Sequence, residues 1–273
     1  MKKLILLALV AVMSLAGRGQ QFFGIDVNKL GLLIAQTVQL PHDNAKIVLQ
    51  STMTALEKNP SGYRKALEFA ENHLGNPADS LHNETLYYSV LEHAVKGFVL
   101  SNSEKQRPKL LLELAQRNKI GSAATDIAYV TPDGKAGSLA GLKGKFVLLY
   151  FNDPDCDACA KTKEALERSS VRQAVEKGDL AVLAINPEDN EKKWKKTDYP
   201  AWMVNGWDKA QVINGEQTYV MPAQLPVFYL ISPEGVVLMK NEASLKRMES
   251  AIEKALGSAD KSADALVKLL FNP

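Results

Sequence analysis

The chain has 273 residues, of which 46% are hydrophobic and 23% charged, and its 33 lysines and arginines nearly balance its 31 aspartates and glutamates. This length exceeds one typical domain and predicts two. The near-neutral charge, without a basic stripe interleaved with aromatic residues, excludes an electrostatically driven nucleic-acid binder.

Residues 1–16 are expected to be a secretory signal peptide. Lys2 and Lys3 precede a nearly unbroken apolar run, and Ser14-Leu15-Ala16 offers the small residues that a signal peptidase recognises. A membrane anchor is the alternative, but a run of about 12 apolar residues is too short to span a bilayer comfortably. We therefore expect cleavage after Ala16, with Gly17 and Gly19 as alternative positions, and an exported, periplasmic protein that is soluble once the signal peptide is removed.

Residues 22–120 are expected to form a helical domain. Apolar residues recur at helical spacing over 63–74 and 86–98. The chain's four histidines all lie in this segment at wide spacings, which favours solvated or capping roles over a metal site: His42, His73, His82 and His93. The segment shows no catalytic constellation, so we interpret it as a packing or recognition element.

From about Gly121 to Leu256, short apolar strands alternate with helical patterns. The expected strands include two buried runs and a hairpin: Phe146–Phe151, Leu180–Ile185, and Val227–Ile231 with Val236–Met239. One helix is expected from Asp157 towards Glu176 and another over Leu245–Leu256. This order predicts an α/β sandwich with a mixed sheet over 121–256. Apolar spacing after Gly257 predicts a helical tail over 257–273.

The two cysteines of the chain, Cys156 and Cys159, lie three apart between the strand expected at 146–151 and the following helix. The first N–H groups of a helix and its dipole stabilise a thiolate on the leading cysteine. A zinc site would need a second pair of ligands, and every histidine lies far upstream. We therefore expect no metal and no cofactor. A redox pair is favoured over a purely structural disulfide.

Two landmarks resemble the thioredoxin-fold family of exported thiol-disulfide oxidoreductases, the TlpA/ResA type. The first runs from Ser138-Leu139 through Leu142-Lys143-Gly144-Lys145 into the strand at 146–151 and the C-x-x-C pair. The second is Gln224-Leu225-Pro226 before the strand at 227–231, followed by Pro233-Glu234-Gly235. The resemblance covers about residues 121–256. The sequence resembles a subgroup of this family whose N-terminal helical domain has no assigned role.

The resemblance implies roles for four residues. Cys156 would be the attacking thiolate, and Cys159 would resolve the mixed disulfide. Leu225 and Pro226 would be joined by a cis peptide bond beside the cysteines and would bind an extended substrate segment through the Leu225 backbone. Alternatively, Pro226 simply begins an edge strand. The implied partners are a disulfide-containing protein substrate and an upstream electron donor.

The sequence departs from the family pattern near the cysteines. Tyr150 stands where the family often has a buried acidic residue, which removes a usual proton acceptor for Cys159. Asp153, Asp155 and Asp157 surround Cys156. Neighbouring carboxylates disfavour a thiolate, so the disulfide is comparatively stabilised and a reducing protein is predicted. The alternative is that the aspartates only form the turn and supply a charge to the helix N-terminus.

Other functions fit the sequence less well. A peroxidase of the peroxiredoxin kind would need a hydroxyl residue where Asp153 stands, and a copper-delivery protein would need a histidine in the second domain. The alternative from another class is a non-catalytic thioredoxin-scaffold binding protein with a structural disulfide. The chain's three tryptophans lie in residues 186–223: Trp194, Trp202 and Trp207. We expect them to pack an inserted helix and loop rather than form a substrate rim.

Overall fold

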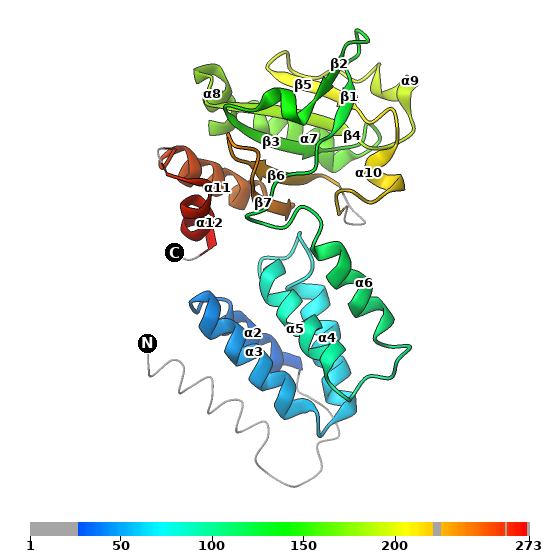
Figure 1. Cartoon of the computed structure of the whole chain (residues 1–273), viewed down its shortest axis with the longest axis vertical. Helices are drawn as coiled ribbons and strands as arrows, with labels where there is room; N and C mark the ends of the chain where they lie inside the picture. Colours follow the sequence, from blue (N-terminus) through cyan, green and yellow to red (C-terminus); the bar gives the residue numbers. More distant parts are fainter. Residues whose placement is uncertain (1–26, 221–224, 260, 272–273) are drawn as a thin grey trace. The chain divides into compact units, whose positions relative to one another are not determined.

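A computed structural model describes residues 27–220, 225–259 and 261–271 (Figure 1). The chain divides into two compact units, one ending at Ala115 and the other running from Gln116 to Phe271. The signal peptide expected at residues 1–16 lies outside the described residues. Within the described ranges, no helix combines the length and apolar character that crossing a bilayer requires.

The described part of the first unit is all-helical, as expected. Its helices are α2 (Val27–Thr37), α3 (His42–Leu56), α4 (Pro60–His73), α5 (Glu84–Lys96) and α6 (Gln106–Ala115). Asparagines cap two of them: the Asn59 side chain accepts from the N–H of Gly62, and the Asn83 side chain from the N–H of Leu86. Apolar side chains of α3, α4 and α5 form a buried core that includes Met53, Ala66 and Leu91.

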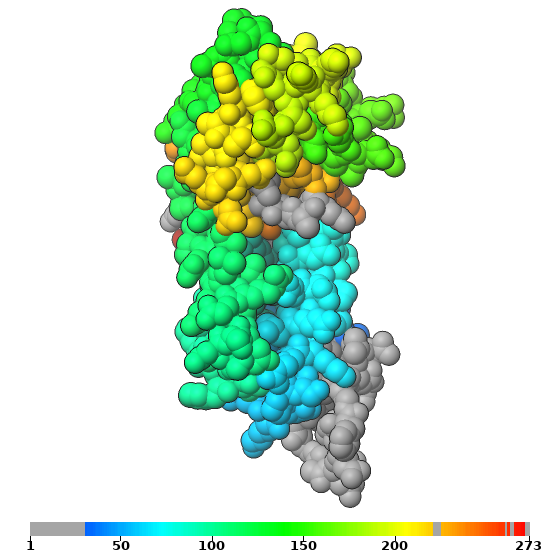
Figure 2. Space-filling model, turned by 90° about the vertical axis from the view of Figure 1, so that its right-hand side faces the viewer, coloured from blue at the N-terminus to red at the C-terminus, as the bar shows by residue number. Residues whose placement is uncertain are grey.

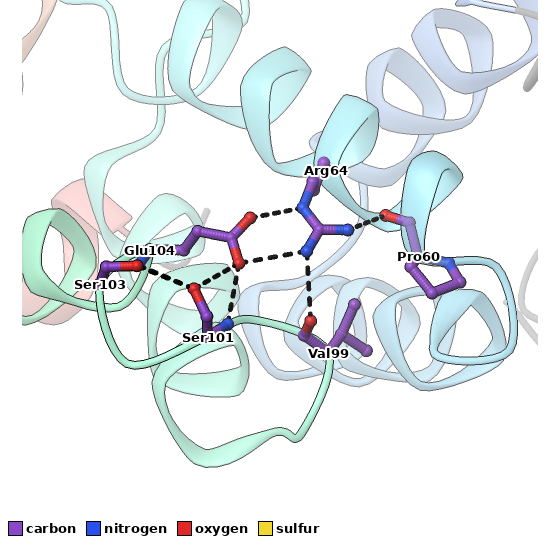
Figure 3. A network of polar contacts seen from close by, with 6 residues as sticks. All are labelled: Pro60, Arg64, Val99, Ser101, Ser103 and Glu104. Carbon is purple, nitrogen blue, oxygen red and sulfur yellow. Dashed lines mark hydrogen bonds and ion pairs between the residues drawn. The ribbon is translucent and has the colours of Figure 1, made fainter.

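The apolar stripe expected over residues 86–98 is wrong at Phe98. Helix α5 ends at Lys96, and the Phe98 side chain beyond it is 95% exposed. The loop that follows is held by Arg64 of α4, which pairs with Glu104 and donates to the carbonyl oxygen of Val99 (Figure 3). Glu104 also accepts from the backbone N–H and hydroxyl of Ser101. These charge-assisted bonds define the loop after the helix has ended.

The second unit contains a mixed sheet, with seven strands among the described residues. They are β1 (Ala128–Val130), β2 (Ala136–Ser138), β3 (Phe146–Phe151), β4 (Leu180–Asn186), β5 (Met203–Trp207), β6 (Val227–Ile231) and β7 (Val237–Glu242). Their spatial order is β2-β1-β5-β4-β3-β6-β7. Strand β3 runs parallel to β4 and antiparallel to β6. Of the three middle strands, β4 and β3 are those that the sequence predicts, whereas β5 is not predicted.

The second unit also contains helices between and after its strands. They are η1 (Leu139–Leu142), α7 (Asp157–Leu166), α8 (Ser170–Lys177), α9 (Glu191–Trp194), α10 (Val212–Gly215), α11 (Leu245–Leu256) and α12 (Ala263–Phe271). The single helix expected from Asp157 to Glu176 is wrong. The chain breaks it after Leu166, and the hydroxyl of Ser169 caps α8 by accepting from the N–H of Val171. Serine competes for backbone partners and so favours caps over helix interiors.

The side chains of strand β3 pack into a buried core on each face of the sheet. Phe146, Leu148 and Tyr150 join one buried cluster, and the alternate residues join the other, as the two-residue period of a strand requires. Residues of α7, α8, α11 and α12 cover the first face. Segments around η1 and α10 contribute to the second. The strand that precedes the cysteines is therefore fixed from both sides.

The segment after β4 contains more regular structure than the expected helix and loop. Besides α9 and α10 it contributes β5, which pairs in parallel with β4. Trp194 and Trp207 are buried and their rings stack at 5.7 Å, which confirms packing for these two. Trp202 is half-buried and donates to Glu167. In Figure 2 this segment, coloured yellow-green to yellow, forms part of the visible surface of the second unit.

Candidate active site

The two cysteines lie where β3 passes into α7. Cys156 is the N-cap residue of α7, and its Sγ accepts a hydrogen bond from the backbone N–H of Cys159 at 3.1 Å. The two residues form a disulfide with Cα atoms 5.1 Å apart. Cys156 is half-buried, whereas Cys159 is only 3% exposed. One sulfur is therefore accessible and held at the positive end of a helix, and the other lies behind it.

Leu225 and Pro226 lie beside this disulfide. The peptide bond between them is cis, as the family resemblance implies. The carbonyl oxygen of Leu225 is 3.3 Å from Sγ of Cys156. Strand pairing explains the placement, because Val227, the first residue of β6, pairs with Phe151, the last residue of β3. The structure thus brings together four of the residues that the sequence singles out.

The three aspartates differ in their surroundings. Asp153 accepts from the backbone N–H of Asp155 at 3.0 Å and from the side-chain amide of Asn190 at 3.1 Å. Asp155 forms an exposed ion pair with Lys193 of α9. Asp157 is exposed in the first turn of α7. Lys193 therefore offsets part of the negative charge that the sequence places near Cys156, although exposed pairs have small effects.

Tyr150 and Asn152 connect the cysteine pair to the sheet. The Tyr150 hydroxyl donates to the carbonyl oxygen of Cys159 at 2.7 Å, and burial raises the pKa of Tyr150 above its ordinary value. Tyr150 therefore stays neutral and does not replace an acidic proton acceptor. The Asn152 amide donates to the carbonyl oxygens of Tyr150 and Ile185, and its oxygen accepts from the hydroxyl of Tyr199.

A small pocket opens beside the cysteines. Its lining is Tyr150, Asn152, Asp153, Pro154, Cys156, Cys159, Ala160, Lys163, Thr197 and Tyr199. Lys163 is the residue that the sequence reasoning missed, whereas Tyr199 belongs to the aromatic segment of residues 186–223, for which the sequence favours packing over a rim beside the cysteines. Lys163 lies one helical turn after Cys159, and this i, i+4 spacing is the signal that could have found it. Tyr199 comes from the segment between α9 and β5, and no local pattern points from there to the cysteines.

The histidines are placed apart in the helical unit. His73 contacts Asp79, His82 contacts the carbonyl oxygen of Leu74, and His93 contacts Tyr63. Among the residues that the structure describes, no three His, Cys, Asp or Glu side chains are grouped to hold a metal ion. The expected solvated or capping role is wrong for His93, which is half-buried and contacts Tyr63 of α4 and Thr54 of α3.

Comparisons with known proteins agree with this geometry. A domain of unknown function, DUF5106, matches residues 31–118, and the AhpC/TSA family matches residues 120–240. A crystal structure of a thioredoxin-like protein from Bacteroides caccae is 30% identical, with 83% of this chain and 82% of that chain covered and a TM-score of 0.78. The chain belongs to the thioredoxin-like proteins. A comparison with curated proteins found no match.

Two further structures each match about half of this thioredoxin-like chain. A conserved protein of unknown function from Bacteroides fragilis is 31% identical, covering 49% of this chain and 98% of that one, with a TM-score of 0.46. The thioredoxin domain of a thiol-disulfide oxidoreductase from Bacteroides vulgatus is 22% identical, covering 50% and 97%, with a TM-score of 0.41. From the two family matches, this thioredoxin-like protein joins a DUF5106 region to an AhpC/TSA domain carrying the Cys156–Cys159 pair.

Proposed function

We propose that this protein is an exported thiol-disulfide oxidoreductase that reduces disulfides of other proteins through Cys156 and Cys159. The observation that carries the proposal is the asymmetric disulfide at the start of α7, with Cys156 accessible and Cys159 buried. A structural disulfide has no need for one sulfur at a helix N-terminus and beside an available backbone segment. Reversible exchange uses both features.

The proposed reaction is a pair of thiol-disulfide exchanges. In the reduced protein the Cys156 thiolate attacks a substrate disulfide, forms a mixed disulfide and expels one substrate thiolate, which takes a proton from water. The Cys159 thiol gives its proton to water, and its thiolate attacks Sγ of Cys156. The mixed disulfide breaks, and the second substrate thiolate leaves. Two electrons pass to the substrate, and the Cys156–Cys159 disulfide remains. An upstream dithiol then reduces it by the reverse exchange and is itself oxidised.

The structure supports this assignment of roles through the hydrogen bonding of Cys156. The N–H of Cys159 points at Sγ of Cys156, so a negative charge on that sulfur meets a donor as well as the helix dipole. Leu225 and Pro226, next to the same sulfur, are the proposed contact for an extended substrate segment. The N-terminal residues 1–16, with the pattern of a signal peptide, support a periplasmic location.

The proposed direction is reduction of the substrate. Asp153, Asp155 and Asp157 disfavour the Cys156 thiolate, and Lys193, which pairs with Asp155 and also attracts Asp153, offsets part of this negative charge. We expect a reduction potential close to that of thioredoxin, about −270 mV, rather than the value of about −120 mV of a strong periplasmic oxidant. Equilibration with glutathione or dithiothreitol buffers measures this directly. A value near −120 mV would overturn the direction and leave the exchange chemistry in place.

Insulin reduction in the presence of dithiothreitol tests the activity itself. The full chain after Ala16 is expected to accelerate insulin precipitation, and the Cys156→Ser, Cys159→Ser double variant is expected to give only the background rate. The Cys159→Ser variant should accumulate mixed disulfides in the native compartment, because its attacking cysteine remains and its resolving cysteine is lost. Equal rates for the wild type and the double variant would favour a binding protein with a structural disulfide.

A further inference from the structure

Lys163 shares a pocket with the cysteine proposed to resolve the mixed disulfide. It lies four residues after Cys159 on α7, and both residues line the same small pocket, which also reaches Tyr150 and Tyr199. Among the described residues that line this pocket, Lys163 is the one cation. Residues four apart on a helix share a face, so the juxtaposition follows from the helix itself.

The ammonium group of Lys163 is held in place by two contacts. Its Nζ donates to the carbonyl oxygen of Asp198 and lies 4.7 Å from the centre of the Tyr199 ring. Tyr199 in turn donates its hydroxyl to Asn152 of the segment between β3 and α7. A lysine side chain fixed in this way loses little further conformational entropy when a negative charge forms nearby. A mobile surface lysine would lose more.

The two tyrosines of the pocket supply neither a positive charge nor a base in the usual pH range. Burial raises the pKa of Tyr199 to about 12 and that of Tyr150 further, so both stay neutral. Asp153 is the one carboxylate among the described lining residues, and the amide of Asn190 and a backbone N–H donate to it. A Cys159 thiolate would therefore face one cation and one carboxylate that already has two donors.

We propose that the Lys163 ammonium stabilises the Cys159 thiolate and thereby speeds the step that resolves the mixed disulfide. In that step the Cys159 thiol gives its proton to water in the pocket, and the resulting thiolate attacks Sγ of Cys156 and displaces the substrate thiolate. Lys163 keeps its proton throughout and acts by its charge. This tuning role rests on the proposed function, because it assumes that Cys159 resolves a mixed disulfide.

Titration of Cys159 tests the charge effect without any substrate. In a Cys156→Ala background, where Cys159 is the sole thiol, absorbance at 240 nm follows the thiolate as pH rises. Replacing Lys163 by Gln is expected to raise the pKa of Cys159 by about one unit, the lower end of the effect of a nearby charge. Lys163→Arg should restore the value. Lys161→Gln is the matched control, since Lys161 lies exposed on the same helix and does not line the pocket.

Each outcome decides the inference separately from the proposed function. An unchanged pKa in Lys163→Gln, or an equal shift in Lys161→Gln, would overturn it even if insulin is reduced. A selective shift supports the charge effect even if insulin is not. In the protein with both cysteines, Lys163→Gln should prolong the mixed disulfide with a model peptide by several-fold. Lys163→Met, which also loses the hydrogen bond to Asp198, should behave like Gln if charge rather than packing is responsible.

Discussion

His93 is a half-buried histidine whose neutral form the helical unit favours. Its Nδ1 lies 3.0 Å from the hydroxyl of Tyr63, and its Nε2 lies 3.0 Å from the hydroxyl of Thr54. Burial lowers the pKa of His93, and the weaker attraction of Glu57 opposes that shift. Between the lowered folded value and the unfolded value of about 6.5, the unfolded chain binds more protons than the folded one. Stability contributed by this group is therefore full above that window and lost as pH falls through it.

Acidification is therefore expected to weaken the helical unit through His93. Hydrogen exchange in the full chain, corrected for intrinsic rates, should show lower opening free energies for α3–α5 at pH 5.5 than at pH 7.5. His93→Gln should flatten this dependence, because glutamine does not titrate. His42→Gln, at the start of α3, is the control and should leave it intact. A dependence that persists in His93→Gln would assign it to another group.

At the level of elements, β5 depends on close packing against its neighbouring strands rather than on the strand propensity of its own residues. Gly206 of β5 pairs with Ile185 of β4, and a Cβ atom at Gly206 would lie 2.7 Å from Cδ1 of Ile185 and 3.0 Å from Cγ of Tyr129. Tyr129 belongs to β1, which pairs with β5 on its other side. A glycine at this position lets the tyrosine ring lie against the strand.

Gly206→Ala is expected to destabilise the second unit by about 1–3 kcal/mol, the usual cost of overpacking. Gly215→Ala in α10 is the matched control, because a Cβ atom there would meet no heavy atom within 4 Å. Urea unfolding followed by tryptophan fluorescence measures both, since Trp207 lies in the same strand. If the two variants lose the same stability, the close approach does not limit this strand.

The strands of the sheet show which parts of the fold could be predicted from the sequence. Strands β3, β4 and β6 are continuous apolar runs, so their position and burial could be predicted, and with them the placement of the cysteines. Strand β5 contains Asn205 and Gly206, which are poor strand formers, and it exists because it pairs with β4.

One local signal and one tertiary contact account for the rest of what the sequence reasoning missed. The break between α7 and α8 depends on the cap at Ser169 rather than on the apolar spacing. The contact between Lys163 and Tyr199 joins residues far apart in the chain. No local period contains that kind of information, so the contribution of Tyr199 to the pocket beside Cys159 could not be predicted, although the position of Lys163 on the face of Cys159 could.

For the whole molecule, the important feature is that each unit has its own buried core. One cluster is built from residues between Ile34 and Leu100, and the two clusters of the sheet unit from residues between Ile127 and Leu266. All three tryptophans of the chain lie in the sheet unit, so their fluorescence reports on that unit alone. Circular dichroism at 222 nm reports on the helices of both.

We therefore expect a core substitution in the helical unit to separate the two signals. Leu91→Ala, at a buried position of α5, should lower the stability of that unit by about 2–5 kcal/mol. The urea transition seen by circular dichroism should move to lower urea while the fluorescence transition stays in place. Leu110→Ala, at an exposed position of α6, is the matched control and should move neither. A common shift of both transitions would mean that the units unfold together.

The chain has only two cysteines, and both form one disulfide, so the redox state of the protein can be followed directly in living cells. A bulky maleimide tag adds nothing to the oxidised form and two tags to the reduced form. A protein caught in a covalent complex through Cys156 would keep one thiol for tagging. Gel mobility of acid-quenched samples would then distinguish the oxidised protein, the reduced protein and the mixed disulfide without purification.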